Sequence, residues 1–228
     1  MRIYKSKNPY NHSFIFIAAA RITLCVLPIF LLVFFLWRSG YKNYLEALGF
    51  AVVLGAIVVA YALLSRHYRI LLSGHRGERV LFKALRYIRK CAHDTVFLNL
   101  PVQYGSSRSE IDLLLVGARG ILIVEVKNHS GVITESVFDG FRLQLKRQRK
   151  ILKNILHEHG YDVWVENALF FSNPHALPRF RPDRNISVFT NASELVRFIN
   201  GLKPDFPLTR ADCNEIVNIV RRFNLNNT

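Results

Sequence analysis

Cysteine is scarce in this chain, which has three among its 228 residues. Cys25, Cys91 and Cys213 lie far apart, and no two have the C-x-x-C spacing of a redox or zinc motif. A disulfide framework and a cysteine-ligated zinc site are therefore excluded, and the composition indicates a reducing compartment. His157 and His159 are two residues apart on a predicted helix, so they do not face a common site.

Acidic residues are also few, with 16 aspartates and glutamates against 31 lysines and arginines. Beyond residue 65 the counts are 15 acidic and 25 basic, an excess of ten positive charges. This excess indicates a polyanionic partner, and both nucleic acid and an anionic lipid surface would satisfy it. No internal repeat or low-complexity tract is visible.

Two long apolar stretches occupy residues 14–37 and 45–64. Each has the length of about 20 residues that crosses a bilayer. Basic residues flank the pair on its outer sides, which places both termini in the cytoplasm. We therefore expect residues 1–65 to be a membrane anchor, a transmembrane helical hairpin in the cell membrane (the inner membrane in a bacterium), with residues 66–228 as a cytoplasmic domain. Arg21 interrupts the first stretch and either snorkels to the interface or marks a contact with a partner.

The remaining pattern predicts an α/β domain, because helical and strand-like segments alternate along it. Their order indicates a mixed β-sheet flanked by helices. The segment from Glu110 to Lys127 is the most informative, since its two continuous apolar runs predict strands that are buried on both faces and joined by a glycine-flanked turn. The predicted strands are 95–103, the 109–127 hairpin, 131–134, 163–171 and 186–190, and the predicted helices are 75–92, 141–159, 192–201 and 209–223.

Four polar side chains lie at the open end of this hairpin. A turn centred in the glycine-flanked segment places Asp112 opposite Glu125 and Glu110 opposite Lys127. Glu125 and Lys127 are two residues apart and share a face, so we expect all four side chains to converge. Opposed carboxylates repel each other, and burial increases the repulsion. A divalent cation between them is the natural counter-charge.

This combination has a chemical use. Two carboxylates can hold Mg²⁺ with water still bound to the ion, and a nearby lysine can orient or deprotonate that water. The alternative for Glu125 and Lys127 is a solvent-facing charged pair on an edge strand. The apolar runs beside them favour a buried site, because buried charges require partners or metal.

Several motifs accompany the hairpin: Glu110-Ile-Asp112, Val116-Gly117-x-x-Gly120, and Val124-Glu125-Val126-Lys127-Asn128 with Gly131. Together they resemble the nuclease-related domain family, NERD, of the PD-(D/E)xK nuclease fold group. Residues 74–78, Gly-His-Arg-Gly-Glu, match the G-x-x-G-E element of the family. Gln148 matches the glutamine of its N-P-x-x-Q element, but Gln144 and Leu145 replace the Asn-Pro pair.

The resemblance implies a restriction-endonuclease-like mixed sheet and a nuclease that hydrolyses DNA with Mg²⁺, or with Mn²⁺ in its place. It assigns Asp112, Glu125, Lys127 and Gln148 to the catalytic set. It assigns Glu78, Asp112 and Glu125 to the metal.

A basic helix follows the hairpin and has six cations and no acid within twelve residues. We predict that it binds the phosphates of nucleic acid, with a solvated face or lipid contact as the alternatives. Its basic residues are Arg142, Lys146, Arg147, Arg149, Lys150 and Lys153.

Three interpretations of the whole chain follow. The first is a membrane-anchored Mg²⁺-dependent nuclease that acts on DNA. The second is a non-catalytic module of the same fold that binds nucleic acid or a partner protein. The third is a membrane scaffold whose basic surface lies on anionic lipid.

Overall fold

The computed structural model describes residues 1–5, 10–39, 44–88, 94–181, 183–204 and 207–225. Contacts divide the chain into two compact units. The larger unit comprises Met1–Lys7 and Gly74–Thr228, and the smaller one comprises Asn8–Ser73.

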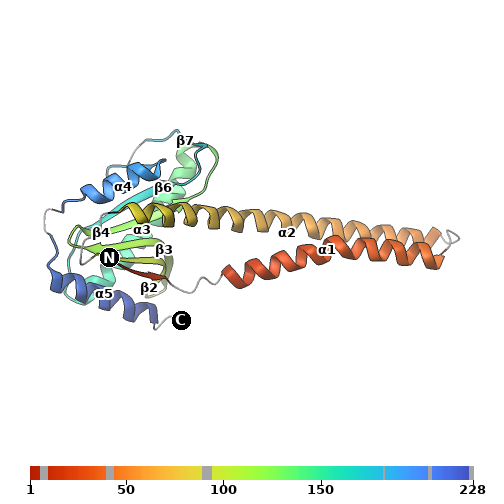
Figure 1. The fold of residues 1–228 in the computed structure, drawn as a ribbon, viewed down its shortest axis with the longest axis horizontal. Coiled ribbons are helices and arrows are strands. Elements are labelled where there is room, and N and C mark those ends of the chain that lie inside the picture. The colour runs from red at the N-terminus through yellow and green to blue at the C-terminus, as the bar shows by residue number, and fades with distance from the viewer. Residues whose placement is uncertain (6–9, 40–43, 89–93, 182, 205–206, 226–228) are drawn as a thin grey trace. The chain divides into compact units, whose positions relative to one another are not determined.

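The larger unit is built on a mixed six-stranded sheet of order β1-β2-β3-β4-β6-β8 (Figure 1). β2, β3 and β4 are antiparallel neighbours, whereas β1, β6 and β8 each pair in parallel. This confirms the predicted mixed sheet flanked by helices. The strands are β1 Arg2–Lys5, β2 Thr95–Tyr104, β3 Ser107–Gly117, β4 Gly120–Lys127, β6 Val165–Phe171 and β8 Ser187–Phe189.

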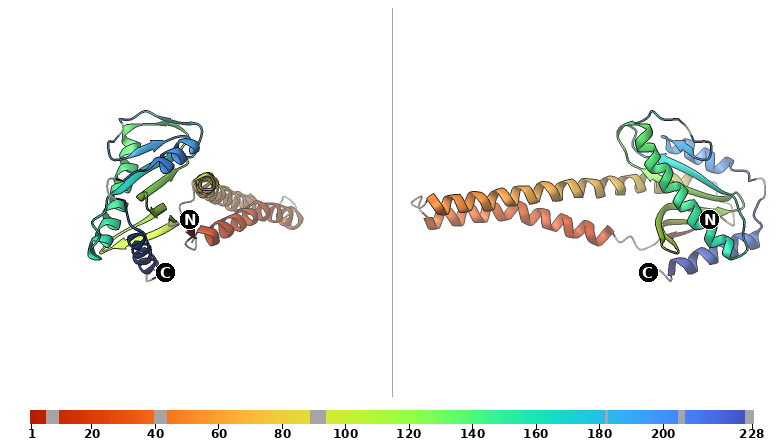
Figure 2. Two further views of the ribbon diagram at one scale, coloured as in Figure 1. Left: turned by 60° about the vertical axis from the view of Figure 1, so that its left-hand side comes forward. Right: turned by 180° about the vertical axis from the view of Figure 1, so that it is seen from behind.

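Helices cover both faces of this sheet (Figure 2). α3, Glu135–Glu158, and α5, Arg210–Leu225, pack on one face. The other face is covered by the last part of α2 (Tyr44–Ala84), by the short helix η1 (Leu85–Tyr87) and by α4 (Ala192–Gly201). Since successive strand residues point to opposite faces, a sheet covered on both sides requires the continuous apolar runs seen in the sequence.

The predicted register of the central hairpin is confirmed. β3 and β4 are antiparallel, and their pairs run from Gly117 with Gly120 at the turn to Leu113 with Val124. This pairing places Asp112 and Glu125 at the open end of the hairpin.

Several elements differ from the sequence-based expectation. β1 belongs to the main sheet, although its residues were assigned to the N-terminal anchor. β5, Gly131–Ile133, pairs with β7, Ala176–Pro178, in a separate two-stranded sheet. The basic helix α3 begins at Glu135, before its predicted start. The helix predicted over 75–92 is the end of α2 followed by η1, and its last part lies outside the described residues.

Arg119 in the turn of the central hairpin forms one ion pair and two hydrogen bonds with other elements. Its Nη2 lies 3.4 Å from Oδ2 of Asp94, the residue that precedes β2. Its Nη1 donates hydrogen bonds to the Ile199 carbonyl at 3.2 Å and to Asn200 Oδ1 at 3.0 Å, both at the end of α4. A Cβ on Gly117 would lie 2.1 Å from Asp94 Oδ1, so only glycine allows this approach. One guanidinium thus joins three elements that are distant in sequence.

The smaller unit contains α1, Tyr10–Ser39, and the first part of α2. Within it, Arg21 Nη2 donates to Tyr61 Oη at 3.4 Å. The Arg21 guanidinium carbon also lies 4.4 Å from the centroid of the Tyr68 ring, a cation–π distance. Arg21 therefore has partners within the chain itself.

Helices do occupy both apolar stretches, yet within the described residues none is long and apolar enough to cross a membrane. This contradicts the predicted transmembrane hairpin at 14–37 and 45–64 and the multi-pass location with both termini in the cytoplasm. The predicted bilayer partner is likewise unsupported. The prediction rested on the length of the two apolar stretches and on their basic flanks, whereas α2 continues without a break through Arg66 and Arg76 to Ala84.

Candidate functional site

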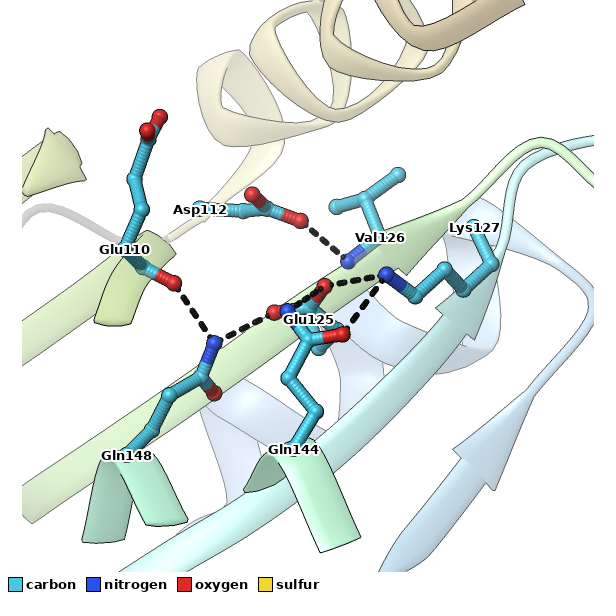
Figure 3. A network of polar contacts seen from close by, with 7 residues as sticks. All are labelled: Glu110, Asp112, Glu125, Val126, Lys127, Gln144 and Gln148. Atoms are coloured by element: carbon cyan, nitrogen blue, oxygen red, sulfur yellow. Dashed lines mark hydrogen bonds and ion pairs between the residues drawn. The ribbon is translucent and has the colours of Figure 1, made fainter. Parts of the chain in front are cut away.

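The pairing of β3 with β4 ends just before the predicted acids. The last pair is Leu113 with Val124. Beyond it, Asp112 Oδ2 accepts a hydrogen bond of 2.7 Å from the backbone N–H of Val126 (Figure 3). A side chain therefore binds a main-chain donor beyond the last pair, and this holds Asp112 beside the strand that carries Glu125.

Glu125 is the centre of the site, and only 2% of its surface is exposed. Its Oε1 accepts hydrogen bonds from Lys127 Nζ at 2.5 Å and from Gln144 Nε2 at 2.7 Å. Its Oε2 accepts a hydrogen bond from Gln148 Nε2 at 2.7 Å. These charge-assisted hydrogen bonds compensate for the water that a buried carboxylate loses.

Helix α3 supplies both glutamines. Gln144 and Gln148 are four residues apart, so they project from the same side of the helix toward β4 (Figure 3). Gln144 Oε1 also accepts from Lys127 Nζ at 3.0 Å, and Gln148 Nε2 also donates to the Glu110 carbonyl at 2.6 Å. Each amide therefore has two partners that fix its orientation. Lys127 Nζ lies 5.3 Å from the centroid of the Phe141 ring on the same helix.

Glu110 joins this network through its backbone. Its carboxylate points away from Gln148 and Lys127 (Figure 3). The expected convergence of four side chains is therefore wrong for Glu110. That expectation assumed regular alternation along β3, whereas Ile111 and Leu113 pack in different cores, on opposite faces of the sheet.

Glu78 comes from the part of α2 that belongs to the larger unit. A Cβ on the preceding Gly77 would lie 3.0 Å from Ser172 Oγ and 3.3 Å from Val126 Cγ1, so the helix approaches β4 with little room for a side chain. Glu78 Oε2 accepts a hydrogen bond from Asn99 Nδ2 at 3.3 Å. The second glycine of the G-x-x-G-E element thus brings the following glutamate close to the sheet.

The acids of the site act on one another electrostatically. Burial, followed by the negative charge of Glu125, raises the pKa of Asp112 from 3.8 to about 8. The Val126 N–H and the Lys127 charge oppose this rise. Burial also raises the pKa of Glu110, with further contributions from Glu78 and Glu125. A counter-charge in this region would stabilise the ionised form of Asp112.

The donor set has the chemistry that a hard divalent cation requires, since it offers carboxylate and amide oxygens. Gln148 Oε1 is buried and has no hydrogen-bond partner among the described residues, so one amide oxygen remains available. The described residues hold no group of three histidine, cysteine or acidic side chains already placed around a metal. Glu125 is fully engaged by protein donors, so it would exchange at least one of them for an ion.

Most basic residues on α3 have partners. Arg142 Nη2 lies 2.6 Å from Asp139 Oδ1, and Lys146 Nζ lies 3.9 Å from Asp183 Oδ2. The other two engaged cations are Lys153, 3.4 Å from Asp162 Oδ1, and Arg149, whose Cζ lies 4.1 Å from the centroid of the Trp164 ring.

Arg147 and Lys150 are exposed on the outer side of α3, as is Lys146. The buried side of the helix carries Leu145, Gln148 and Ile151 instead. The predicted basic surface therefore lies on the helix that supplies the glutamines, and its exposed charges are Lys146, Arg147 and Lys150.

Two residues of the site were not predicted as members. Gln144 departs from the family motif, but its spacing of four from Gln148 places it on the same side of α3. Asn99 is an isolated amide in an apolar strand, and that was the signal available for it. The structure brings Gln144 to Glu125 and Asn99 to Glu78.

Comparison with known proteins agrees with this geometry. No curated protein and no solved structure matches the chain. Residues 73–172 match the family model of the nuclease-related domain, NERD, a segment that includes the central hairpin, the end of α2 and all of α3. The mixed sheet flanked by helices fits a nuclease-like fold. The match supports membership of the NERD family for this segment of the chain.

Proposed function

We propose that this chain is a nuclease that hydrolyses phosphodiester bonds in DNA, with Mg²⁺ as its cofactor or Mn²⁺ in its place. The observation that carries the proposal is the buried Glu125 carboxylate, held by Lys127 and two glutamines at the end of the hairpin where Asp112 also lies. Concentrating buried acids in this way costs free energy, and such perturbed groups cluster at functional sites. The match to the nuclease-related domain supports the same conclusion.

Each side chain has a role in the proposal. Asp112 and Glu125 would hold the ion, with Glu78 supporting it, and a divalent ion there supplies charge for the phosphate and lowers the pKa of a bound water. Lys127 Nζ lies 2.5 Å from Glu125 Oε1 and would orient the attacking water. Gln148 positions Glu125, because its amide joins Oε2 to the Glu110 carbonyl.

A second candidate is a module of the same fold that binds nucleic acid without cleaving it. One observation favours it, since both oxygens of Glu125 already accept hydrogen bonds from protein donors. A site neutralised in this way by Lys127 needs no ion for stability.

Incubation of the full-length chain with supercoiled plasmid DNA tests the proposal. We expect nicked or linear DNA with Mg²⁺ or Mn²⁺ and intact plasmid with a chelator, because the ion is required for hydrolysis. The products are separated on agarose, and a gel-shift assay on the same samples measures binding. DNA binding without cleavage in either metal would favour the non-catalytic module.

The exposed charges of α3 give a prediction about DNA affinity. Each lysine or arginine that neutralises a phosphate contributes about 0.9 to the slope of log K against log salt concentration. Replacing Lys146, Arg147 and Lys150 with glutamine should therefore flatten that slope by about 2–3 units.

Fluorescence anisotropy with a labelled duplex at several salt concentrations measures this slope. Arg197→Gln provides the control, because it removes one exposed charge from α4 on the other face of the sheet. An unchanged slope in the triple variant would remove these three residues from the DNA-binding surface.

A further inference from the structure

Asn99 has an unusual backbone for a strand residue. Its φ is 51°, and among the described residues it is the one non-glycine residue with a positive φ. It lies within β2 and is only 6% exposed. Asparagine tolerates this left-handed conformation better than most residues, but glycine adopts it at lower cost. The conformation alone would favour glycine, so the amide requires a separate reason.

On either side of Asn99, the paired side chains of β2 and β3 point to opposite faces of the sheet. β2 and β3 pair at Leu98 with Leu113 and again at Leu100 with Ile111, with no recorded pair between them. Leu98 and Leu113 belong to the core beneath α2 and α4.

Leu100 and Ile111 belong to the opposite core, beneath α3 and α5. Residues two apart in a regular strand share a face, so both strands rotate at the unpaired positions, which are Asn99 and Asp112. The left-handed residue therefore lies directly across from the acid that the site requires.

The Asn99 side chain also makes a contact that the rotation of the strand does not explain. Its Nδ2 donates to Glu78 Oε2 at 3.3 Å, which links β2 to the helix that carries Glu78. The tight packing at Gly77 brings this part of the helix against β4 and places the adjacent Glu78 near the sheet. The amide thus holds one acid while the backbone turns the strand next to a second acid, Asp112.

We propose that Asn99 is a positioning residue of the metal site, because its amide holds the Glu78 carboxylate in the orientation that supports the ion. This inference rests on the proposed function and deepens it. A glycine at this position would keep the left-handed backbone and lose the amide. A residue retained only for its conformation would be replaceable by glycine without effect on metal binding.

Asn99→Gly in the full-length chain separates the two roles. In chelator, its thermal unfolding temperature should equal or exceed that of the parent, because glycine relieves the backbone. The Mg²⁺ or Mn²⁺ concentration for half-maximal thermal stabilisation should rise by about tenfold or more, the scale of losing a residue that orients a metal ligand. The metal requirement for plasmid cleavage should rise in parallel.

Glu78→Gln and the double variant complete the test. If Asn99 acts through Glu78, the double variant should need no more metal than the more affected single variant, because the two changes remove one interaction. If Asn99→Gly unfolds, Glu78→Gln alone must still raise the metal concentration that is required. If Glu78→Gln needs no more metal than the parent, the inference is overturned.

The outcomes also distinguish this inference from the proposed function. An unchanged metal midpoint in Asn99→Gly, with a metal-responsive parent, would overturn the positioning role alone. A parent that neither cleaves DNA nor gains stability from metal would overturn both.

Discussion

Glu125→Gln and Lys127→Ala should each reduce metal-dependent DNA cleavage by about two orders of magnitude or more while the chain stays folded. Glutamine at position 125 removes the charge that would bind the ion and directs amide hydrogens at a site already filled with donors. Alanine at position 127 removes the amine that lies 2.5 Å from Glu125 Oε1 and donates also to Gln144.

Initial rates of plasmid nicking at saturating metal measure these losses, and circular dichroism checks the fold of each variant. Glu166→Gln is the matched control, since it makes the same chemical change to a half-buried glutamate on the neighbouring strand β6, beyond the site. Parental rates in Lys127→Ala would show that this amine does not orient the attacking water. Parental rates in Glu125→Gln would remove the centre of the proposed site.

Asp112→Asn should change how the stability of the metal-free protein depends on pH. The folded chain raises the pKa of Asp112 from 3.8 to about 8, chiefly through burial and then through Glu125. Between these values the folded state keeps a proton that the unfolded state has released. The stability that this group contributes is therefore complete below pH 3.8 and is lost as the pH rises toward about 8.

Asparagine does not titrate, and its oxygen can still accept the hydrogen bond from the Val126 N–H. In chelator, the variant should match the parent at acidic pH and exceed it at mildly alkaline pH, when thermal unfolding is followed across the range. Millimolar Mg²⁺ or Mn²⁺ should stabilise the parent at alkaline pH, because the ion binds the folded, ionised site. The variant should lose most of this gain.

Two results would contradict this account of Asp112. Strong destabilisation of Asp112→Asn at every pH would assign the side chain a structural role at the end of the ladder. An equal response of parent and variant to metal would mean that Asp112 and Glu125 do not share an ion.

The hairpin was predictable because residues that are close together in the sequence determine its register. Two apolar runs and one glycine-flanked turn admit few registers, and the confirmed pairing of Leu113 with Val124 follows from them. The acids next to this pair were therefore located correctly along the strands. The basic helix was predictable for the same reason, since its cations and apolar positions recur at helical spacing.

The remaining features depend on contacts between distant segments. Asn99 interrupts an otherwise regular strand pattern, so alternation predicted the wrong face for Glu110. The role of Gln144 appears only when α3 lies against β4. β1 is short and joins the sheet through β2, which no local pattern indicated. The apolar stretches were interpreted from their length and their basic flanks, and this gave the contradicted membrane prediction.

The contacts of Arg119 limit how far this protein can be shortened. The segment recognised as a nuclease-related domain ends at residue 172, yet Arg119 binds Ile199 and Asn200 beyond that limit. A fragment of residues 73–172 alone would lack α4. Arg119 would lose its acceptors there, and the core that Leu195 covers would be exposed. The fragment would also lack β1 and β8, the two edge strands of the sheet. The unit that sequence comparison recognises is thus smaller than the unit that folds.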